Sequence, residues 1–191
     1  MNMTRTVVNL CWLVLIIYWL TSAASSKRSA RPGLWRPRAG IRLIILIVAV
    51  VVVQLPASRK FLADLRQRTP DPNSVAAISG VIICVAGVAL AVGARAYLGR
   101  NWGMPMSLRE GHELVTSGPY AYIRHPIYSG ILLLTLGSAI AVNPAWLAPF
   151  VLFLLYFVQA ARMEERDMTK QFPDVYPAYQ RRTKMLIPFL L

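Results

Sequence analysis

"VAAISGVIICVAGVALAVGA", residues 75–94, is a run of 20 residues without a charged side chain. An α-helix needs about 20 apolar residues to cross the ~30 Å hydrocarbon core of a bilayer. An uninterrupted apolar run of this length is typical of a membrane-spanning helix and too long for most strands. In this chain of 191 residues, it predicts a membrane-embedded, all-α protein.

Three further apolar blocks accompany this run. Each contains at most one charged residue, and they cover 7–24, 41–57 and 128–161. An Asn-Pro pair interrupts the last block and leaves two short segments, 128–142 and 145–161. Two short helices with a tight turn between them predict a helical hairpin whose ends return to one side of the membrane. We therefore expect a polytopic protein with about five transmembrane helices.

The basic residues are distributed unevenly along the chain. The formal net charge is +13, and basic clusters follow the first, third and last apolar blocks. Because cytoplasmic loops carry an excess of Lys and Arg, we place 25–38, 100–127 and 162–191 in the cytoplasm. A basic cluster between 59 and 68 then lies on the opposite side, against this rule. We attribute the excess of basic residues to the orientation of the protein in the membrane and to contact with anionic lipid. We expect no nucleic-acid partner. In a bacterium the location would be the inner membrane.

The 75–94 run also carries signs of helix capping and close packing. Asn73 or Ser74 precedes it and can cap the helix N-terminus. Small residues recur along it at a spacing of three or four, at Ala76, Gly80, Cys84, Gly87 and Ala91. Such a spacing lets a second helix approach closely in lipid. Cys11 and Cys84 both fall inside apolar blocks, so we expect them to pack there and not to form a disulfide or a metal site.

The least lipid-like stretch of the C-terminal half is "GPYAYIRHPIYSG", residues 118–130, which leads directly into the last apolar block. It offers Arg124 and His125 for an anion, and three tyrosine rings whose faces suit an adenine or a cation. At the other end of the predicted hairpin lies "RMEERD", residues 162–167, with Glu164 and Glu165 as acceptors. The hairpin therefore predicts that two polar clusters meet in space.

These groups together suit one common cofactor. A molecule with a carboxylate, an ammonium, a diol, a purine and a sulfonium would use all of them, and S-adenosylmethionine is such a molecule. An adenine nucleotide with phosphates would require more positive charge and no paired glutamates. We therefore predict an S-adenosylmethionine site on the cytoplasmic side, with Arg124 among the cofactor contacts.

Residues 111–130, "GHELVTSGPYAYIRHPIYSG", closely resemble the cofactor segment of the isoprenylcysteine carboxyl methyltransferase family. The paired glutamates and the following "FPDVYPAYQRRTKMLIP", residues 172–188, are similar to the family's closing segment. The resemblance covers roughly residues 98–188, and phospholipid methyltransferases are similar in the same region. It implies two parts, an N-terminal membrane part over 1–97 and a cofactor-binding region over 98–191.

The resemblance also implies site residues. Cofactor contacts, many through the backbone, are implied at His112, Glu113, Leu114, Val115, Tyr120, His125, Pro126, Ile127, Tyr128 and Glu164. The family's arginine for the substrate carboxylate is replaced by Ala160, and Arg162 could substitute for it from the next turn. Pro173 stands where the family usually has glycine. We interpret four tail residues as headgroup ligands, with the tail as a lid: Tyr176, Tyr179, Arg181 and Arg182.

The predicted activity is methyl transfer from S-adenosylmethionine to a lipophilic acceptor, foremost the carboxylate of an isoprenylcysteine-like molecule. The catalytic candidates are Arg162, which would position a carboxylate, and Glu165, the nearest base for an amine or hydroxyl acceptor. Phospholipid amine methylation is the first alternative. A sterol-type reductase would need a longer chain and more basic residues for NADPH, and a non-enzymatic membrane adaptor would leave the two polar clusters unexplained.

Overall fold

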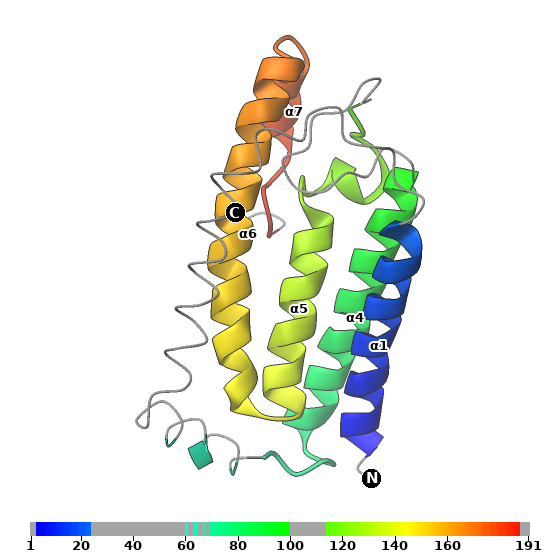
Figure 1. The fold of residues 1–191 in the computed structure, drawn as a ribbon, viewed down its shortest axis with the longest axis vertical. Coiled ribbons are helices and arrows are strands. Elements are labelled where there is room, and N and C mark those ends of the chain that lie inside the picture. Colours follow the sequence, from blue (N-terminus) through cyan, green and yellow to red (C-terminus); the bar gives the residue numbers. More distant parts are fainter. Residues whose placement is uncertain are drawn as a thin grey trace.

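The computed structural model describes residues 3–23, 60, 63, 64, 67, 69–99 and 114–187. Its elements in chain order are α1 (Met3–Ala23), α4 (Val75–Leu98), η3 (Gly118–Ala121), α5 (Pro126–Ala141), η4 (Pro144–Trp146), α6 (Leu147–Gln171) and α7 (Tyr176–Arg182). The four long helices run side by side along the long axis of the molecule (Figure 1). Over the described ranges the β-structure is one isolated bridge, so the predicted all-α fold is confirmed.

Three of these helices are long and apolar enough to cross a membrane, namely Met3–Ser22, Val75–Leu98 and Pro144–Gln171. The apolar helix α5 is shorter, with 16 residues, or about 24 Å at 1.5 Å per residue. The chain is thus an integral membrane protein built of helices, as predicted. The predicted span over 41–57 lies outside the described residues, so the count of about five stays a prediction.

Among the described helices, α4 and α5 approach so closely that backbone atoms of one contact backbone atoms of the other. A methyl group added at Gly80 would lie 2.5 Å from the nitrogen of Ala141, and one added at Gly87 would lie 2.6 Å from the nitrogen of Leu134. Glycines of α5 face α4 in the same way. The predicted small-residue stripe is therefore confirmed, except that Ala76 is exposed and its neighbour Ala77 is buried in its place.

The start of α4 is capped as the sequence predicts. The hydroxyl of Ser74 accepts a hydrogen bond from the backbone N–H of Ala77 at 3.1 Å. The preceding turn is closed by Asp71, whose carboxylate accepts the N–H of Asn73 at 3.0 Å. Each of these bonds satisfies a backbone donor at a place where no helical partner exists.

Trp12 joins helix α1 to the hairpin. Trp12 donates its indole N–H to Ser138 at 3.1 Å and stacks on Trp146 with ring centroids 5.2 Å apart.

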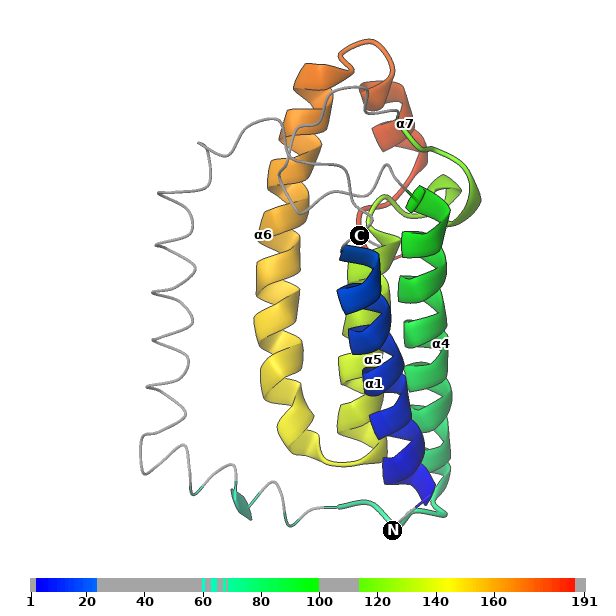
Figure 2. The ribbon, with the colours of Figure 1, turned by 45° about the vertical axis from the view of Figure 1, so that its right-hand side comes forward.

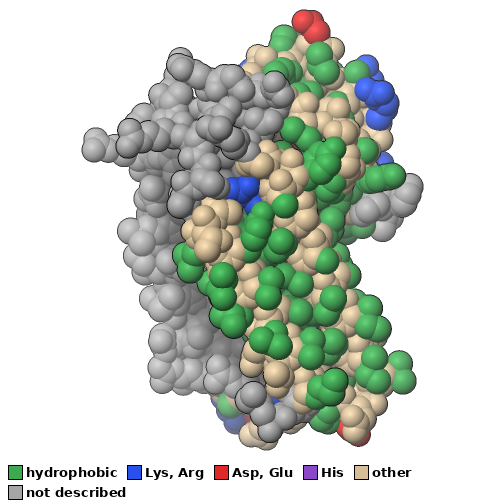
Figure 3. Space-filling model, turned by 90° about the vertical axis from the view of Figure 1, so that its right-hand side faces the viewer, with side chains coloured by type: hydrophobic (Ala, Val, Ile, Leu, Met, Phe, Trp, Pro, Cys, Tyr) green, Lys and Arg blue, Asp and Glu red, His purple; other side chains and the backbone are tan. Residues whose placement is uncertain are grey.

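Cys11 and Cys84 are free and buried, as predicted. Hydrophobic side chains cover much of the face drawn in Figure 3, and the acidic side chains visible there lie near its two ends.

Helices α5 and α6 form a hairpin, closed by a short turn at Asn143. The side chain of Asn143 accepts the N–H of Ala145 at 2.8 Å, and Pro144 opens the 3-10 turn that follows. Helix α6 has 25 residues and continues past the apolar segment to Gln171. Its charged C-terminal part therefore extends beyond the start of α5, beside the loop that precedes α5 (Figure 2). The hairpin thus places the two polar clusters at one end of the bundle.

Candidate active site

The 3-10 turn in the loop before α5 begins with Gly118, where any other residue would be strained. Gly118 has φ +59°, and a methyl group there would lie 2.7 Å from the ring of Tyr97. The Tyr97 and Ser117 hydroxyls are 2.9 Å apart and share a hydrogen bond. Pro119 lies in the first turn of η3, and Pro126 lies in the first turn of α5. Proline is tolerated at both places because the first turn of a helix has no partner for its N–H.

The C-terminal segment runs alongside this loop. The backbone N–H of Arg124 donates to the carbonyl of Lys184 at 2.8 Å, and that of His125 donates to Met185 at 3.1 Å. The Tyr179 hydroxyl donates to the carbonyl of Tyr120 at 2.6 Å. Two segments about 60 positions apart in the sequence therefore form one unit.

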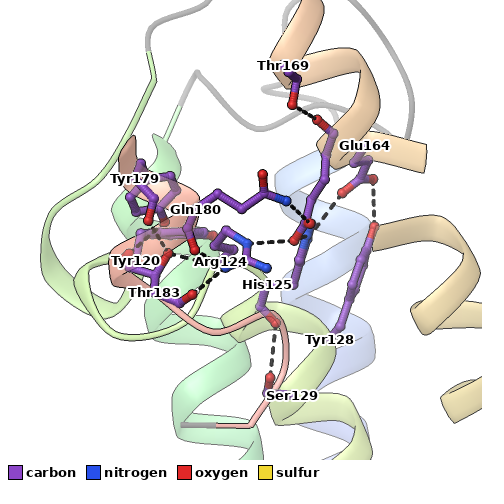
Figure 4. A network of polar contacts seen from close by, with 11 residues as sticks. Tyr120, Arg124, His125, Tyr128, Ser129, Glu164, Thr169, Tyr179, Gln180 and Thr183 are labelled. Carbon is purple, nitrogen blue, oxygen red and sulfur yellow. Dashed lines mark hydrogen bonds and ion pairs between the residues drawn. The ribbon is translucent and has the colours of Figure 1, made fainter. Parts of the chain in front are cut away.

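Four charged or titratable side chains meet between this unit and α6 (Figure 4). Nε of Arg124 lies 2.6 Å from Oε1 of Glu165. His125 lies between the two glutamates, with Nδ1 3.4 Å from Oε2 of Glu164 and Nε2 3.4 Å from Oε1 of Glu165. The side chain of Glu164 is 21% exposed, whereas those of Arg124, His125 and Glu165 are 9–10% exposed. Glu164 is thus the member of the cluster that is most open to a ligand.

The carboxylates set the charge of His125. Burial alone would lower the pKa of His125, but hydrogen bonds and charge attraction from Glu164 and Glu165 outweigh it and raise the pKa above its ordinary 6.5. The imidazolium form therefore persists to a higher pH than in a free histidine. With His125 protonated, two cations face two carboxylates, and the charges of the cluster balance.

An aromatic stack connects this cluster to the membrane part of the hairpin. The rings of His125 and Tyr128 are stacked with centroids 5.3 Å apart, and Tyr128 stacks on Phe157 at 4.5 Å. The Tyr128 hydroxyl donates to Oε1 of Glu164 at 2.7 Å. The stack continues to Phe153 of α6. The polar site and the lipid-facing hairpin are thus in direct contact.

Comparison with known proteins identifies the family. The model of the isoprenylcysteine carboxyl methyltransferase (ICMT) family matches residues 80–170. Protein-S-isoprenylcysteine O-methyltransferase B of Arabidopsis thaliana is 30% identical over 149 residues, covering 76% of this chain and 73% of that protein. The chain belongs to the isoprenylcysteine carboxyl methyltransferase family. It is thus a member of a family of methyltransferases.

Two other matches cover a smaller share of the protein that is matched. Methanethiol S-methyltransferase 2 of Bradyrhizobium diazoefficiens is 39% identical over 84 residues, covering 42% of this chain and 30% of that protein. The solved structure of the eukaryotic intramembrane Ras methyltransferase ICMT matches with a TM-score of 0.55 and 24% identity, covering 81% of this chain and 53% of that chain. That likeness shows the fold. The chain spans about half or less of these two proteins.

Several of the cofactor-binding residues predicted from the sequence lie close together around one buried cluster. Val115 packs against the buried cluster that holds Tyr120, Ile127 and Tyr128. Leu114 is half-buried at the start of the described loop, and Pro126 is buried. His112 and Glu113 lie outside the described residues.

Two interpretations from the sequence bear on Glu165 and on the tail. Both oxygens of Glu165 accept hydrogen bonds, one from Arg124 and the other from the amide of Gln180 at 2.8 Å, and its role as a base stays a prediction. In the tail, Tyr176 and Tyr179 are 3% and 5% exposed. The interpretation of these two tyrosines as headgroup ligands is wrong, because they pack inward.

The tail residues that complete the site were missed by the sequence analysis. Gln180, Thr183 and Leu186 contact the loop or α6 largely through backbone carbonyls. A carbonyl contact places no demand on the side chain, so the residue type carries no signal for it. Only the pairing of the tail with the loop reveals these residues.

Proposed function

We propose that this protein transfers a methyl group from S-adenosylmethionine to a lipophilic acceptor at the membrane surface, and that the acceptor group is a carboxylate of an isoprenylcysteine-like molecule. The observation that carries the proposal is the meeting of His125 and Glu164 at the end of the hairpin, in a chain of the ICMT family. S-adenosylmethionine supplies an electrophilic methyl group on a sulfonium.

The charge of the cluster suits this cofactor. Arg124 and Glu165 neutralise each other at 2.6 Å, which leaves the imidazolium of His125 for a carboxylate and Glu164 for an ammonium or ribose hydroxyl. A cluster without net charge is a poor place for the several phosphates of NADPH, because each phosphate charge would be buried without a counter-charge. The reductase alternative is therefore disfavoured.

In the part of the chain that the structure describes, Glu165 already accepts a hydrogen bond at each oxygen, which favours an acceptor that needs no base. A carboxylate has a pKa near 4 and is charged at neutral pH. An ammonium must first lose a proton to a base. Phospholipid amine methylation therefore fits less well than carboxyl methylation.

A thiol is the second candidate acceptor, because a relative that is 39% identical over 84 residues is named a methanethiol S-methyltransferase. A free thiol has a pKa near 8.5, so only a small fraction is thiolate at neutral pH. It would also need help with deprotonation, although less than an amine. The carboxylate remains the first proposal.

Arg162 is the proposed residue for holding the acceptor carboxylate. It lies on α6 three residues before Glu165 and is exposed, where a molecule in the lipid headgroup region can reach it. Arg166, one turn further along the same helix, is also exposed. We place this end of the bundle in the cytoplasm, where the methyl donor is made, because exposed basic residues gather on the tail here.

The acceptor is tested with methyl-labelled S-adenosylmethionine and three acceptors in membranes: a prenyl-thio acid, an aminophospholipid and an alkyl thiol. We expect base-labile label in the prenyl-thio acid. Replacing Arg162 with Gln should reduce kcat/KM for it by about tenfold or more, equivalent to about 1.4 kcal/mol of transition-state binding. Arg166→Gln is the matched control and should leave the rate unchanged. Label that enters only the aminophospholipid or only the thiol would overturn the carboxylate assignment.

A further inference from the structure

Two of the three nitrogens of the Arg124 guanidinium, Nε and Nη1, are engaged by contacts within the protein. Its Nε donates to Oε1 of Glu165 at 2.6 Å, and its Nη1 donates to the carbonyl of Gln180 at 3.1 Å and to the carbonyl of Thr183. These partners belong to α6, to α7 and to the residue just after α7. One side chain therefore joins three parts of the chain.

The partners of Arg124 are joined to each other as well. The amide of Gln180 donates to Oε2 of Glu165, so Arg124, Glu165 and Gln180 form a closed ring of contacts. The carbonyl of Gln180 lies in the last turn of α7, where helical carbonyls lack internal partners. We call Arg124, Glu165, Gln180 and Thr183 the clasp.

Backbone contacts extend the clasp to His125. The N–H groups of Arg124 and His125 donate to the carbonyls of Lys184 and Met185, and the hydroxyl of Ser129 donates to the carbonyl of Leu186. The main chain of His125 is therefore held by the tail and its imidazole by α6. If the tail moved, His125 would lose its position relative to Glu164.

We infer that Arg124 is a positioning residue, and that through the clasp the C-terminal segment Tyr176–Leu186 is a structural part of the cofactor site. The sequence predicts Arg124 among the cofactor contacts, whereas its Nε and Nη1 are directed at α6 and the tail. The two adjacent glutamates then have different tasks. Glu165 holds the clasp, and Glu164, the more exposed of the two, faces the ligand. The part of the inference that concerns the cofactor rests on the proposed function.

The first arm of the test needs no ligand. Hydrogen exchange of the ligand-free protein in detergent is compared between wild type, Arg124→Gln and Glu164→Gln. We expect Arg124→Gln to speed the exchange of the amides at 124, 125 and 184 by about tenfold or more, since their acceptors lie on the opposite segment. Glu164→Gln should leave these amides protected. Unchanged exchange in Arg124→Gln would overturn the clasp.

The second arm measures the affinity for S-adenosylhomocysteine together with the melting temperature. Arg124→Lys keeps the charge but cannot reach Glu165 and both carbonyls at once, so its loss of affinity should lie between wild type and Arg124→Gln. Gln180→Ala removes one contact of the ring and should weaken binding by a few-fold at an unchanged melting temperature. Arg182→Gln, an exposed arginine of the same tail, is the matched control and should behave as wild type.

The two arms separate the inference from the proposed function. Weaker binding in Arg124→Gln with fully protected amides would make Arg124 a direct ligand and overturn the inference. If wild type fails to bind S-adenosylhomocysteine while the exchange pattern is as expected, the proposed cofactor is wrong and the clasp stands.

Discussion

At the scale of single residues, His125 determines how the site responds to pH. It lies 3.4 Å from each of two carboxylates, beside the guanidinium of Arg124, and its pKa is raised above 6.5. A group whose pKa is higher in the folded protein stabilises that protein fully below its unfolded pKa. This contribution is lost as the pH rises through the folded pKa.

The first prediction follows from the direction of this pKa shift. The melting temperature of wild type should fall, relative to that of His125→Gln, as the pH is raised from about 6 towards 9. The reason is that the imidazolium loses its attraction to Glu164 and Glu165 when it loses its proton. Thermal unfolding in detergent over this range gives the two curves. Parallel curves would mean that the pKa of His125 is the same in the folded and the unfolded protein, against the upward shift expected here.

The residue scale also shows what sequence can and cannot predict at this site. His125 and Glu164 could be placed together because an Asn-Pro break predicts a hairpin and a hairpin brings its two ends together. The role of Glu165 could not be predicted, since its partners Arg124 and Gln180 come from two other segments. Pairings of this kind depend on how the tail folds back, and no local pattern encodes that.

At the scale of the elements, the contact between α4 and α5 stabilises the bundle. A methyl group at Gly87 would lie 2.6 Å from the nitrogen of Leu134 and 2.7 Å from the carbonyl oxygen of Gly130. Both atoms are backbone, so neither helix can yield locally. Gly93 of the same helix has no atom within 4 Å of the corresponding position.

The second prediction compares these two glycines. Gly87→Ala should lower the free energy of unfolding by about 2 kcal/mol or more, because the helices must separate. Gly93→Ala should leave it unchanged or raise it by up to about 1 kcal/mol, since alanine is the better helix former. Denaturant unfolding of both variants in one detergent measures the difference. Equal stabilities would show that α4 and α5 do not pack in this way.

The helices themselves were predictable to different degrees. Spans and caps follow from local physics, namely uncharged length and a hydroxyl at Ser74. The sequence predicts the inward face of α4 almost correctly. The exception is that Ala77 is buried and Ala76 is exposed. The C-terminal extension of α6 to Gln171 was not anticipated, because charged residues after an apolar run end a span without ending a helix.

In the molecule as a whole, α4 and the hairpin lie between two ends. One end carries the polar cluster, and the other carries the turns that precede α4 and join α5 to α6. The site loop lies beyond the C-terminus of α4, and the turn at Asp71 lies before its N-terminus (Figure 1). Helix α4 has 24 residues, about 36 Å, which is enough to cross the hydrocarbon core.

The third prediction is that these two ends are accessible from opposite sides of the membrane. Single cysteines at Asn73 and Ala121, both exposed, are introduced into a protein in which Cys11 and Cys84 are replaced by alanine. In oriented vesicles a membrane-impermeant maleimide should label one position from outside and the other only after permeabilisation. Labelling of both from the same side would refute α4 as a span.

Binding of S-adenosylhomocysteine shows whether the loop and α6 together form a cofactor site. Calorimetry on purified wild type should show saturable binding, and NADPH should show none. Replacing Glu164 with Gln removes a charged partner from a largely buried site, which typically costs about 2–5 kcal/mol and here should weaken binding more than tenfold. Arg166→Gln, the control, should bind as wild type does. Undiminished binding in Glu164→Gln, or no binding in wild type, would show that this cluster is not a cofactor site.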